Sequence, residues 1–196
     1  MVKNFIVACA LVLVGSTSHA ATEIAFADIA WGSAGEIVKA RMLEHGFTFV
    51  RVDQEGDLQF NGTINGEPAG VVALQNGDGR LVKWLVTILP KEERALGYYR
   101  GLKQDLAARY GEAAIDREDW IFPYADGGHV GHEEIAIRAG KGVLKAAWAT
   151  QRALPAVVIG MTDRLLVTAE YEGPGWNEEI DRRRAQPPAR SSGGQR

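Results

Sequence analysis

The sequence predicts one α+β domain, in which antiparallel strands form one extended sheet or two abutting sheets with both principal helices packed on one side. Three observations lead to this fold class. Glycine-containing turn pairs recur at short intervals between apolar runs, which is typical of antiparallel hairpins. Two longer segments instead carry apolar residues at helical spacing. The chain does not sustain the strand–helix–strand alternation that a parallel sheet requires.

The predicted organisation has three parts, namely a signal peptide over residues 1–20, the α+β domain over 21–176, and a short helix with a disordered tail over 177–196. Removal of the signal peptide leaves roughly 175 residues, which is enough for one domain with its own core. The apolar content of the whole chain, 46%, suits a globular protein.

The N-terminal residues predict export. Lys3 precedes the uncharged run FIVACALVLVG, which has the length of the apolar region of a secretory signal and is too short to span a bilayer. Ser18 and Ala20 supply small residues at the two positions that a signal peptidase reads, so we expect cleavage after Ala20. IVAC resembles a lipoprotein box, but lipidation at Cys9 would leave only about five apolar residues before the cut. We therefore expect a periplasmic or secreted protein.

The composition of the mature chain excludes several classes of function. Cys9 is the single cysteine and leaves with the signal peptide, so disulfides, thiol nucleophiles and cysteine-bound metals are excluded. The formal charge of −3 becomes −4 when Lys3 is removed, which provides no broad basic field for nucleic acid. No later apolar segment approaches the length of a membrane span, so we expect no integral membrane segment after signal cleavage.

The first helix is predicted to start at WGSAGEI, after a leading strand in TEIAFADIAWG. Ser33 and Glu36 have the spacing of a capping box, in which their oxygens accept hydrogen bonds from free N–H groups of the first turn. An anion site is disfavoured because Glu36 already supplies negative charge there. A serine nucleophile is also disfavoured, since Trp31 replaces the first glycine of G-x-S-x-G, although Asp126 and His129 follow in hydrolase order.

This helix places Ala34, Ile37, Val38 and Met42 on one side, and we expect it to end at Gly46 in a left-handed conformation. Four antiparallel strands are predicted after it, in FTFVRV, LQFNGTI, EPAGVVAL and RLVKWLVTIL. Their turn signals include Asn61-Gly62, Asn65-Gly66 and Asn76-Gly77. The expected core face of the last strand consists of Val82, Trp84, Val86 and Ile88.

A second helix is predicted to open at Pro90 and to end before Gly111. Gly97 and Gly101 form a GxxxG pair, and the charged residues around them rule out a membrane helix, so we expect this pair to approach the sheet closely. The core-facing stripe of the helix consists of Ala95, Tyr99, Leu102, Leu106 and Tyr110.

A second set of strands completes the domain. EEIAIRAGKGVLKAAW predicts a hairpin centred on residues 140–142, and AVVIGMTDRLLVTAEY predicts another around 162–163. The chain therefore reads as two units of a helix followed by short strands, a crude internal duplication without clear sequence identity. WNEEIDRRRA predicts a short helix, in which Arg182, Arg183 and Arg184 form a basic patch. For this patch, an anionic-partner site and a solvated surface are the alternatives.

The candidate metal site is the loop YADGGHVGHEE, with Asp126, His129, His132 and Glu133 as ligands of Zn²⁺ or a similar cation. Two imidazoles and several carboxylates in one glycine-rich loop can converge on a cation. The order H-x-x-H-E differs from the metalloprotease order H-x-x-E-H, and the glycines argue against a helix. A solvent-exposed connection without a ligand explains the same composition.

The aromatic residues give a second indication of a binding surface. Trp120, Phe122 and Tyr124 alternate before the metal-candidate loop, and Trp176 lies in a glycine–proline turn, so some of them are candidates for a partner surface. For the other tryptophans, we expect burial of Trp31, Trp84 and Trp148.

The stretch WGSAGEIVKARMLEHG resembles the opening of many small exported bacterial proteins of uncharacterised function. The order of helices and meanders is also similar to that of the small lipoprotein of the outer-membrane β-barrel assembly machinery and of the β-lactamase-inhibitor proteins. The likeness covers about sixteen residues and the order of elements. The chain departs from the lipoprotein pattern because it lacks an acceptable lipidated cysteine. The resemblance implies a non-catalytic binding or assembly module, with no functional residues to carry over.

Two functions from different classes follow from the sequence. The first is a non-enzymatic exported envelope protein that binds another protein, since no catalytic motif is complete. The second is a metal-binding protein or metal-dependent enzyme that uses the loop with His129 and His132. The first requires no cofactor, and the second requires Zn²⁺ or a related ion.

Overall fold

The computed structural model describes residues 28–125, 127–128, 130–148 and 156–185, and within them it contains four helices and one antiparallel sheet of eight strands. The predicted α+β class with an antiparallel sheet is therefore confirmed. The helices are α1 (Gly35–Glu44), α2 (Glu92–Tyr110), α3 (Glu133–Arg138) and α4 (Trp176–Ala185). The strands are β1 (Thr48–Val52), β2 (Leu58–Ile64), β3 (Glu67–Gln75), β4 (Leu81–Ile88), β5 (Ile115–Trp120), β6 (Gly142–Trp148), β7 (Ala156–Met161) and β8 (Val167–Glu172).

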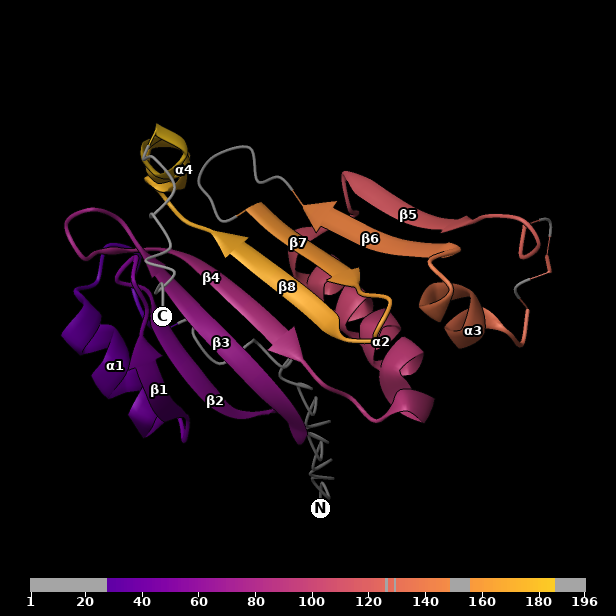
Figure 1. The fold of residues 1–196 in the computed structure, drawn as a ribbon, viewed down its shortest axis with the longest axis horizontal. Helices are drawn as coiled ribbons and strands as arrows, with labels where there is room; N and C mark the ends of the chain where they lie inside the picture. Colours follow the sequence, from indigo (N-terminus) through magenta and orange to yellow (C-terminus); the bar gives the residue numbers. More distant parts are fainter. Residues whose placement is uncertain (1–27, 126, 129, 149–155, 186–196) are drawn as a thin grey trace, which may run out of the picture.

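The sheet consists of two four-stranded meanders that meet at their last strands. The strand order is β1-β2-β3-β4-β8-β7-β6-β5, and β4 pairs antiparallel with β8 at the centre (Figure 1). A helix precedes each meander, α1 before β1 and α2 before β5, so the two units repeat one order of elements. The second unit differs by carrying α3 between β5 and β6.

Three helices pack on one face of the sheet. Val38 and Met42 of α1, Tyr99 of α2 and Ile137 of α3 belong to one hydrophobic core together with alternate residues of the strands. In β4, the predicted core face is confirmed, since Val82, Trp84, Val86 and Ile88 are all buried. Figure 1 shows α2 behind β7 and β8, so its viewer looks onto the opposite face, which we call the open face.

The first helix forms as predicted, but the capping box is wrong. Ser33 Oγ donates a hydrogen bond to the backbone oxygen of Ala30 at 2.6 Å, and the N-cap residue is Ala34, which makes no side-chain cap bond. The cause is pairing with β4, because the backbone N–H of Leu81 donates to Ser33 O at 3.0 Å. This bond holds Ser33 in the chain leading up to the helix and moves the helix start one residue on. The hydroxyl is therefore engaged locally, and the nucleophile partners Asp126 and His129 lie outside the described residues.

The described part of the predicted leading strand is not a strand. Residues 28–32 form turns, and residues 22–27 lie outside the described part of the chain. Trp31, predicted to be buried, is half-buried and packs against the core. Its ring occupies the space beside Gly173, where any side chain would overlap it.

A predicted hairpin is replaced by a helix. Residues 133–138, EEIAIR, form α3 rather than a strand, because Glu133 in the first turn and Arg138 in the last turn complement the helix dipole. Gly140 ends the helix at φ +66°, with Lys141 N–H donating to Ala136 O at 2.8 Å. Gly46 ends α1 in the same way at φ +82°, as predicted.

A second turn signal also lies inside an element. Asn61-Gly62 belongs to β2. The ring of Phe47 packs on this strand at Gly62, where a side chain would lie 2.5 Å from the ring. The other predicted turns hold. Asn65 and Gly66 have φ angles of 53° and 79° and join β2 to β3, as a tight hairpin requires.

The helix predicted from Pro90 is α2, and its buried residues match the predicted stripe except that Tyr110 is only partly buried and Leu96 is added. The GxxxG expectation is wrong. Gly97 and Gly101 are exposed, and a methyl group at either position would have no atom within 4 Å. The pair therefore lies on the outer surface of α2 rather than against the sheet.

Because both glycines are exposed inside a helix, Gly97→Ala and Gly101→Ala are each expected to raise the free energy of unfolding by about 0.5–1 kcal/mol. Alanine lowers the backbone entropy of the unfolded chain and meets no neighbour in the folded one. Urea unfolding of the two variants tests this. A loss of stability in either would show that the glycines approach another segment.

Candidate binding surface

The open face carries a row of residues that crosses all eight strands. Its members face away from the core because, in the central strands, the residues before and after each of them are buried or, for Tyr171, packed against the core. In order across the sheet, the row is Arg51, Gln59, Val72, Leu85, Glu170, Val158, Ala147 and Ile115. We call its five apolar members, Val72, Leu85, Val158, Ala147 and Ile115, the apolar row.

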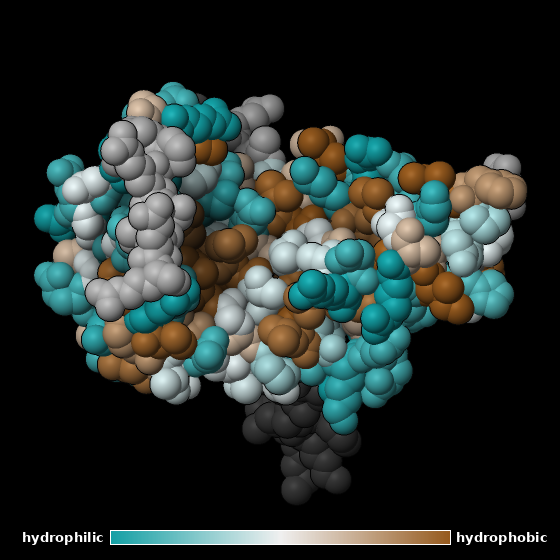
Figure 2. All heavy atoms as spheres, viewed as in Figure 1, coloured by the Kyte–Doolittle hydropathy of each residue, from teal (hydrophilic) through white to brown (hydrophobic). Residues whose placement is uncertain are grey.

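The apolar row leaves hydrocarbon at the surface of the described protein. Val72, Leu85, Val158 and Ala147 are half-buried and Ile115 is 46% exposed. Figure 2, viewed from the same side as Figure 1, shows hydrophobic residues gathered in a recess in the middle of this face. In a strand with one solvated face, polar residues usually alternate with apolar ones along the sequence. Apolar residues on both faces of β3, β4 and β7 therefore indicate a second buried surface.

The next row along the strands is made of small and polar residues. It consists of Thr48, Asn61, Gly70, Thr87, Thr168, Gly160, Lys145 and Arg117. We call its four central members, Gly70, Thr87, Thr168 and Gly160, the small-residue row. A methyl group at Gly70 would lie 3.8 Å from its nearest neighbour and one at Gly160 would lie 3.5 Å from its nearest neighbours, so a methyl group fits at both positions.

The charges at the centre of the open face neutralise one another in part. Lys83 Nζ donates to Glu170 at 2.6 Å and to Glu172 at 3.1 Å, and its side chain is only 9% exposed. The indole ring of Trp176 lies 4.5 Å from the same ammonium group. This contact attaches the start of α4 to the open face.

A buried ion cluster fixes the rest of α4 at the end of the sheet, beyond the last residue of β8 (Figure 1). The Arg183 guanidinium donates to both oxygens of Asp57 at 2.8 Å, to Glu179 at 2.6 Å and to the backbone oxygen of Gln75 at 2.8 Å. Asp57 and Glu179 are 3% and 2% exposed. Burial opposes ionisation of Glu179, but hydrogen bonds from Arg182 and Arg183 outweigh it and hold the pKa of this carboxyl below its ordinary value.

The predicted basic patch is therefore largely committed to folding. Arg182 and Arg183 pair with carboxylates of the chain itself, and Arg184 lies 3.7 Å from Asp181 with 71% of its side chain exposed. The side chains of Arg182 and Arg184 remain 38% and 71% exposed, so an anionic-partner site and a solvated surface stay as alternatives for these two arginines. These ion pairs hold α4 in place beside the open face.

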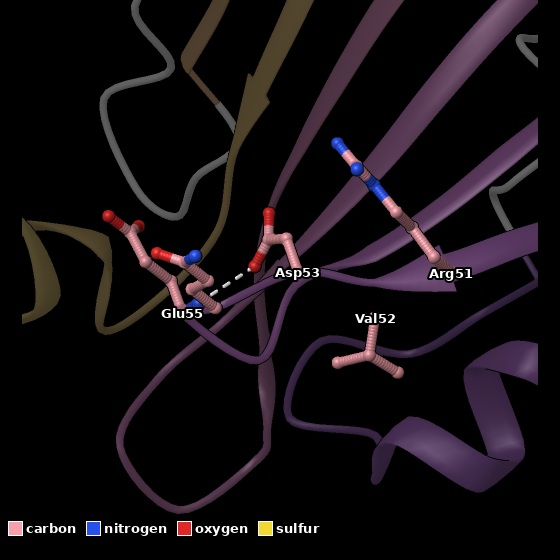
Figure 3. Close-up of a pocket in the computed structure, with 5 residues that line it drawn as sticks. Arg51, Val52, Asp53 and Glu55 are labelled. Atoms are coloured by element: carbon pink, nitrogen blue, oxygen red, sulfur yellow. Dashed lines mark hydrogen bonds between the residues drawn. The ribbon is translucent and has the colours of Figure 1, made fainter. Parts of the chain in front are cut away.

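A shallow pocket of about 490 Å³ lies at the turn from β1 to β2, lined by residues 51–55 (Figure 3). Its polar side chains already serve the fold. Asp53 accepts hydrogen bonds from the backbone N–H groups of Glu55 at 2.9 Å and Asp57 at 3.0 Å, and Arg51 donates to Gln59 at 3.0 Å. Because these polar groups already form hydrogen bonds that shape the turn, few of them are available to bind a ligand.

The predicted metal loop is only partly described. His132 is exposed and precedes α3 as its N-cap residue, and Glu133 is the first residue of that helix. Asp126 and His129 lie outside the described residues. Among the residues that are described, no three His, Cys, Asp or Glu side chains form a group that can hold a metal ion. The metal site therefore stays a prediction.

If the loop binds a cation, Zn²⁺ titration of the mature protein gives one equivalent bound, and His129→Ala and His132→Ala each lower the affinity at least about tenfold, because each removes one ligand. Isothermal calorimetry measures this. His45→Ala is the matched control, since His45 pairs with Asp28 away from the loop. Binding that is equal in all three variants would contradict a site at this loop.

The predicted surface aromatics fall into two groups. Phe122 is 82% exposed in the turn after β5, whereas Trp120 and Tyr124 are half-buried. Trp176 is half-buried over Lys83, as described above. Trp84 and Trp148 are buried on strands, as predicted.

No protein-family model, curated protein or solved structure matches this chain. The resemblance of WGSAGEIVKARMLEHG to small exported proteins therefore stays a prediction. Within the described ranges, no helix has both the length and the apolarity to cross a membrane.

Sequence reasoning missed the open face as a candidate surface. The signal was present, because EPAGVVAL and RLVKWLVTIL have apolar residues at both odd and even positions. Such strands are buried on both faces. The helices account for only one of these faces in the described structure.

Proposed function

We propose that this chain is a non-enzymatic protein of the cell envelope that binds another protein through the open face of its sheet. The observation that carries the proposal is the apolar row, which has members in both meanders on the face opposite α1, α2 and α3 and is interrupted at β8 by Glu170. Exposed apolar surface around a few paired charges is typical of a protein–protein interface. The envelope location rests on the predicted signal peptide.

The size of the open face fits a protein better than a small molecule. Eight strands at about 4.8 Å spacing span about 34 Å, and four rows of side chains cover about 20 Å along the strands, which gives roughly 700 Å². A standard interface buries about 800 Å² on each partner. A small-molecule site would instead be a concave pocket that encloses most of its ligand.

The ion cluster around Lys83 is compatible with such an interface. Its two carboxylates are 37% and 28% exposed, so they lie at the surface while the ammonium group is covered. A partner therefore meets charges that are already paired, and it does not have to desolvate a lone ion. The apolar residues on both sides of the cluster supply the area to be buried.

Affinity capture from envelope extract tests the proposal with a matched pair of variants. Val158→Lys places a charge in the apolar row beside Glu170, its cross-strand neighbour, so the fold tolerates it. Ile37→Lys places the same charge at a 51% exposed position on α1. We expect a reproducible partner with the wild type and with Ile37→Lys, and its loss with Val158→Lys at an unchanged unfolding temperature. Equal capture by both variants would contradict binding at the open face.

A further inference from the structure

We propose that Asn76 is a site of non-enzymatic deamidation, in which the backbone nitrogen of Gly77 attacks the side-chain carbonyl carbon of Asn76. The two residues lie in the turn between β3 and β4. The inference goes beyond the proposed function and does not depend on it, because the reaction needs no partner protein.

The chain and water supply every atom of the reaction. The nitrogen of Gly77 forms a bond to Cγ of Asn76 and gives up its proton, and the side-chain amide of Asn76 leaves as ammonia, which closes a cyclic imide. Water then opens the imide at either of its carbonyl carbons. One product is aspartate, and the other is isoaspartate, in which the main chain runs through the former side chain. In both cases a water molecule is consumed and ammonia is released, without any oxidation or reduction.

The side-chain oxygen of Asn76 is held by two backbone N–H groups. Those of Asp78 and Arg80 donate to Asn76 Oδ1 at 3.1 and 2.9 Å. Because both partners are donors, the atom that they bind is the carbonyl oxygen and not the amide nitrogen. Attack at Cγ turns this oxygen into an oxyanion, and donors that are in place before the reaction stabilise such a charge. The turn therefore supplies an oxyanion hole for its own asparagine.

The attacking residue, Gly77, is not held by the sheet. The ladder between β3 and β4 ends at the pair Gln75–Leu81, so Gly77 lies in the turn beyond it. Among the described backbone hydrogen bonds of this turn, none uses the Gly77 N–H group. Gly77 is exposed, so water reaches the imide, and it has no side chain to hinder the approach of its nitrogen to Cγ.

The pair Asn61-Gly62 has the same sequence signal but lies inside a strand. The two residues pair with Gly70 and Ala69 in the ladder between β2 and β3. Closing an imide here would disrupt that ladder. The ring of Phe47 also covers Gly62, which leaves little room for the chain to move. We therefore expect the folded protein to protect Asn61.

The pair Asn65-Gly66 is held in the tight turn from β2 to β3. Asn65 has a φ angle of 53° and Gly66 one of 79°, and a turn with two central residues needs this left-handed conformation. Ring closure would force the Asn65 backbone out of it. Among the described residues, no backbone N–H group donates to the side-chain oxygen of Asn65 or Asn61. The oxyanion hole thus distinguishes Asn76 from both.

The modified turn adjoins the ion cluster that holds α4. Gln75, the residue before Asn76, donates its backbone N–H to Asp57 at 2.8 Å, and its backbone oxygen accepts from Arg183 at 2.8 Å. Aspartate at position 76 keeps an oxygen for the two N–H donors, whereas isoaspartate lengthens the main chain by a methylene carbon beside the cluster. The separated isoaspartate form should therefore unfold at a lower temperature than Asn76→Asp. Equal unfolding temperatures would contradict this consequence.

Incubation of the protein at neutral pH, followed by mass spectrometry, tests the proposal. One tryptic peptide, residues 52–80, contains all three Asn-Gly pairs, so fragment ions compare the three sites within the same molecule. Deamidation raises the mass of the reacted residue by about 1 Da. In the folded protein, we expect Asn76 to react at least about tenfold faster than Asn61 and Asn65. In the protein unfolded in urea, the three should react at similar rates, because a glycine follows each of them.

Gly77→Ala tests the attacking group. Its methyl group would lie 3.5 Å from the side chain of Arg182, which is an ordinary contact, so the fold tolerates it. We expect the reaction at Asn76 to become at least about fivefold slower, because the methyl group hinders the nitrogen, and the other two asparagines to keep their rates. Gly97→Ala is the matched control, since it adds the same group on the outer surface of α2 and should change none of the rates.

Three results would each overturn the proposal. The first is a rate at Asn76 that does not exceed those at Asn61 and Asn65 in the folded protein. The second is a rate at Asn76 that is lower in the folded protein than in urea, because the turn would then protect the side chain instead of activating it. The third is an unchanged rate at Asn76 in Gly77→Ala.

Discussion

Replacing Arg183 by methionine is expected to lower the free energy of unfolding by about 3–5 kcal/mol, because it leaves buried carboxylates without their cation. The Arg183 side chain is 14% exposed, and its guanidinium binds Asp57, Glu179 and Glu55 together with a backbone oxygen. Methionine fills part of the volume but pairs with none of these groups. Urea denaturation of the mature protein measures the difference.

Arg184→Met is the matched control for this prediction. It removes the same charge from the same helix, but its side chain is 71% exposed and its nearest carboxylate is 3.7 Å away. We expect a change within about 0.5 kcal/mol, as for other surface substitutions. Equal losses for the two arginines would mean that the ion cluster does not hold α4 on the sheet.

The same cluster predicts the sign of an acid dependence. Because the pKa of Glu179 is below its ordinary value of 4.5 in the folded protein, the unfolded chain binds the proton more readily. The stabilising contribution is therefore complete above pH 4.5 and is lost as the pH falls through the lower folded pKa. The acid-induced loss should be smaller in Arg183→Met, because this variant has already lost part of the charge pairing.

Trp148→Ala is expected to destabilise the protein by about 3–5 kcal/mol, as usual for a large aromatic residue removed from a core. Trp148 is 3% exposed on β6, and its indole Nε1–H donates to the backbone oxygen of Gly111 at 2.9 Å, at the end of α2. The substitution removes both the packing and the hydrogen bond between sheet and helix. Thermal or urea unfolding measures the loss.

Phe122→Ala is the control, because it also removes an aromatic ring but from a position that is 82% exposed. Its stability should change by less than about 0.5 kcal/mol. Trp148→Phe should fall between, since it keeps much of the packing and loses the hydrogen bond. A Trp148→Ala variant as stable as the wild type would show that this tryptophan is not part of the core.

The order of elements could be predicted from the sequence because it depends on local signals. Asn65-Gly66 adopts the positive φ angles that a tight hairpin needs, and Gly46 ends α1 wherever the helix begins. The alternation from Val82 to Ile88 gave the core face of β4. These residues act through neighbours close in sequence, so no distant contact was needed to interpret them.

The wrong predictions share a different cause, which is a distant contact that overrides a local signal. Ser33 is drawn out of the cap by its backbone bond with Leu81, and Gly62 stays in a strand because the ring of Phe47 lies over it. The role of Arg183 could not be found locally either, because Asp57 is 126 positions away in the chain.

The candidate surface also could not be predicted from local sequence signals. The apolar row has a single member on each of five strands, and which strands are neighbours is known only from the order of the sheet. Val72 and Val158 come from different meanders, and the pairing of β4 with β8 is what places them in one row. The sequence indicated apolar strands but not which of their residues would form one surface.

Site-specific photo-crosslinking in cells is the most direct test of binding at the open face. A benzoylphenylalanine residue replaces Leu85 at the middle of the apolar row, and a second protein carries it at Ile37 on α1 as the control. We expect one discrete protein adduct from position 85, absent from position 37 and abolished when Val158→Lys is added. Adducts from position 37 alone, or an adduct from position 85 that Val158→Lys leaves unchanged, would contradict binding at the open face.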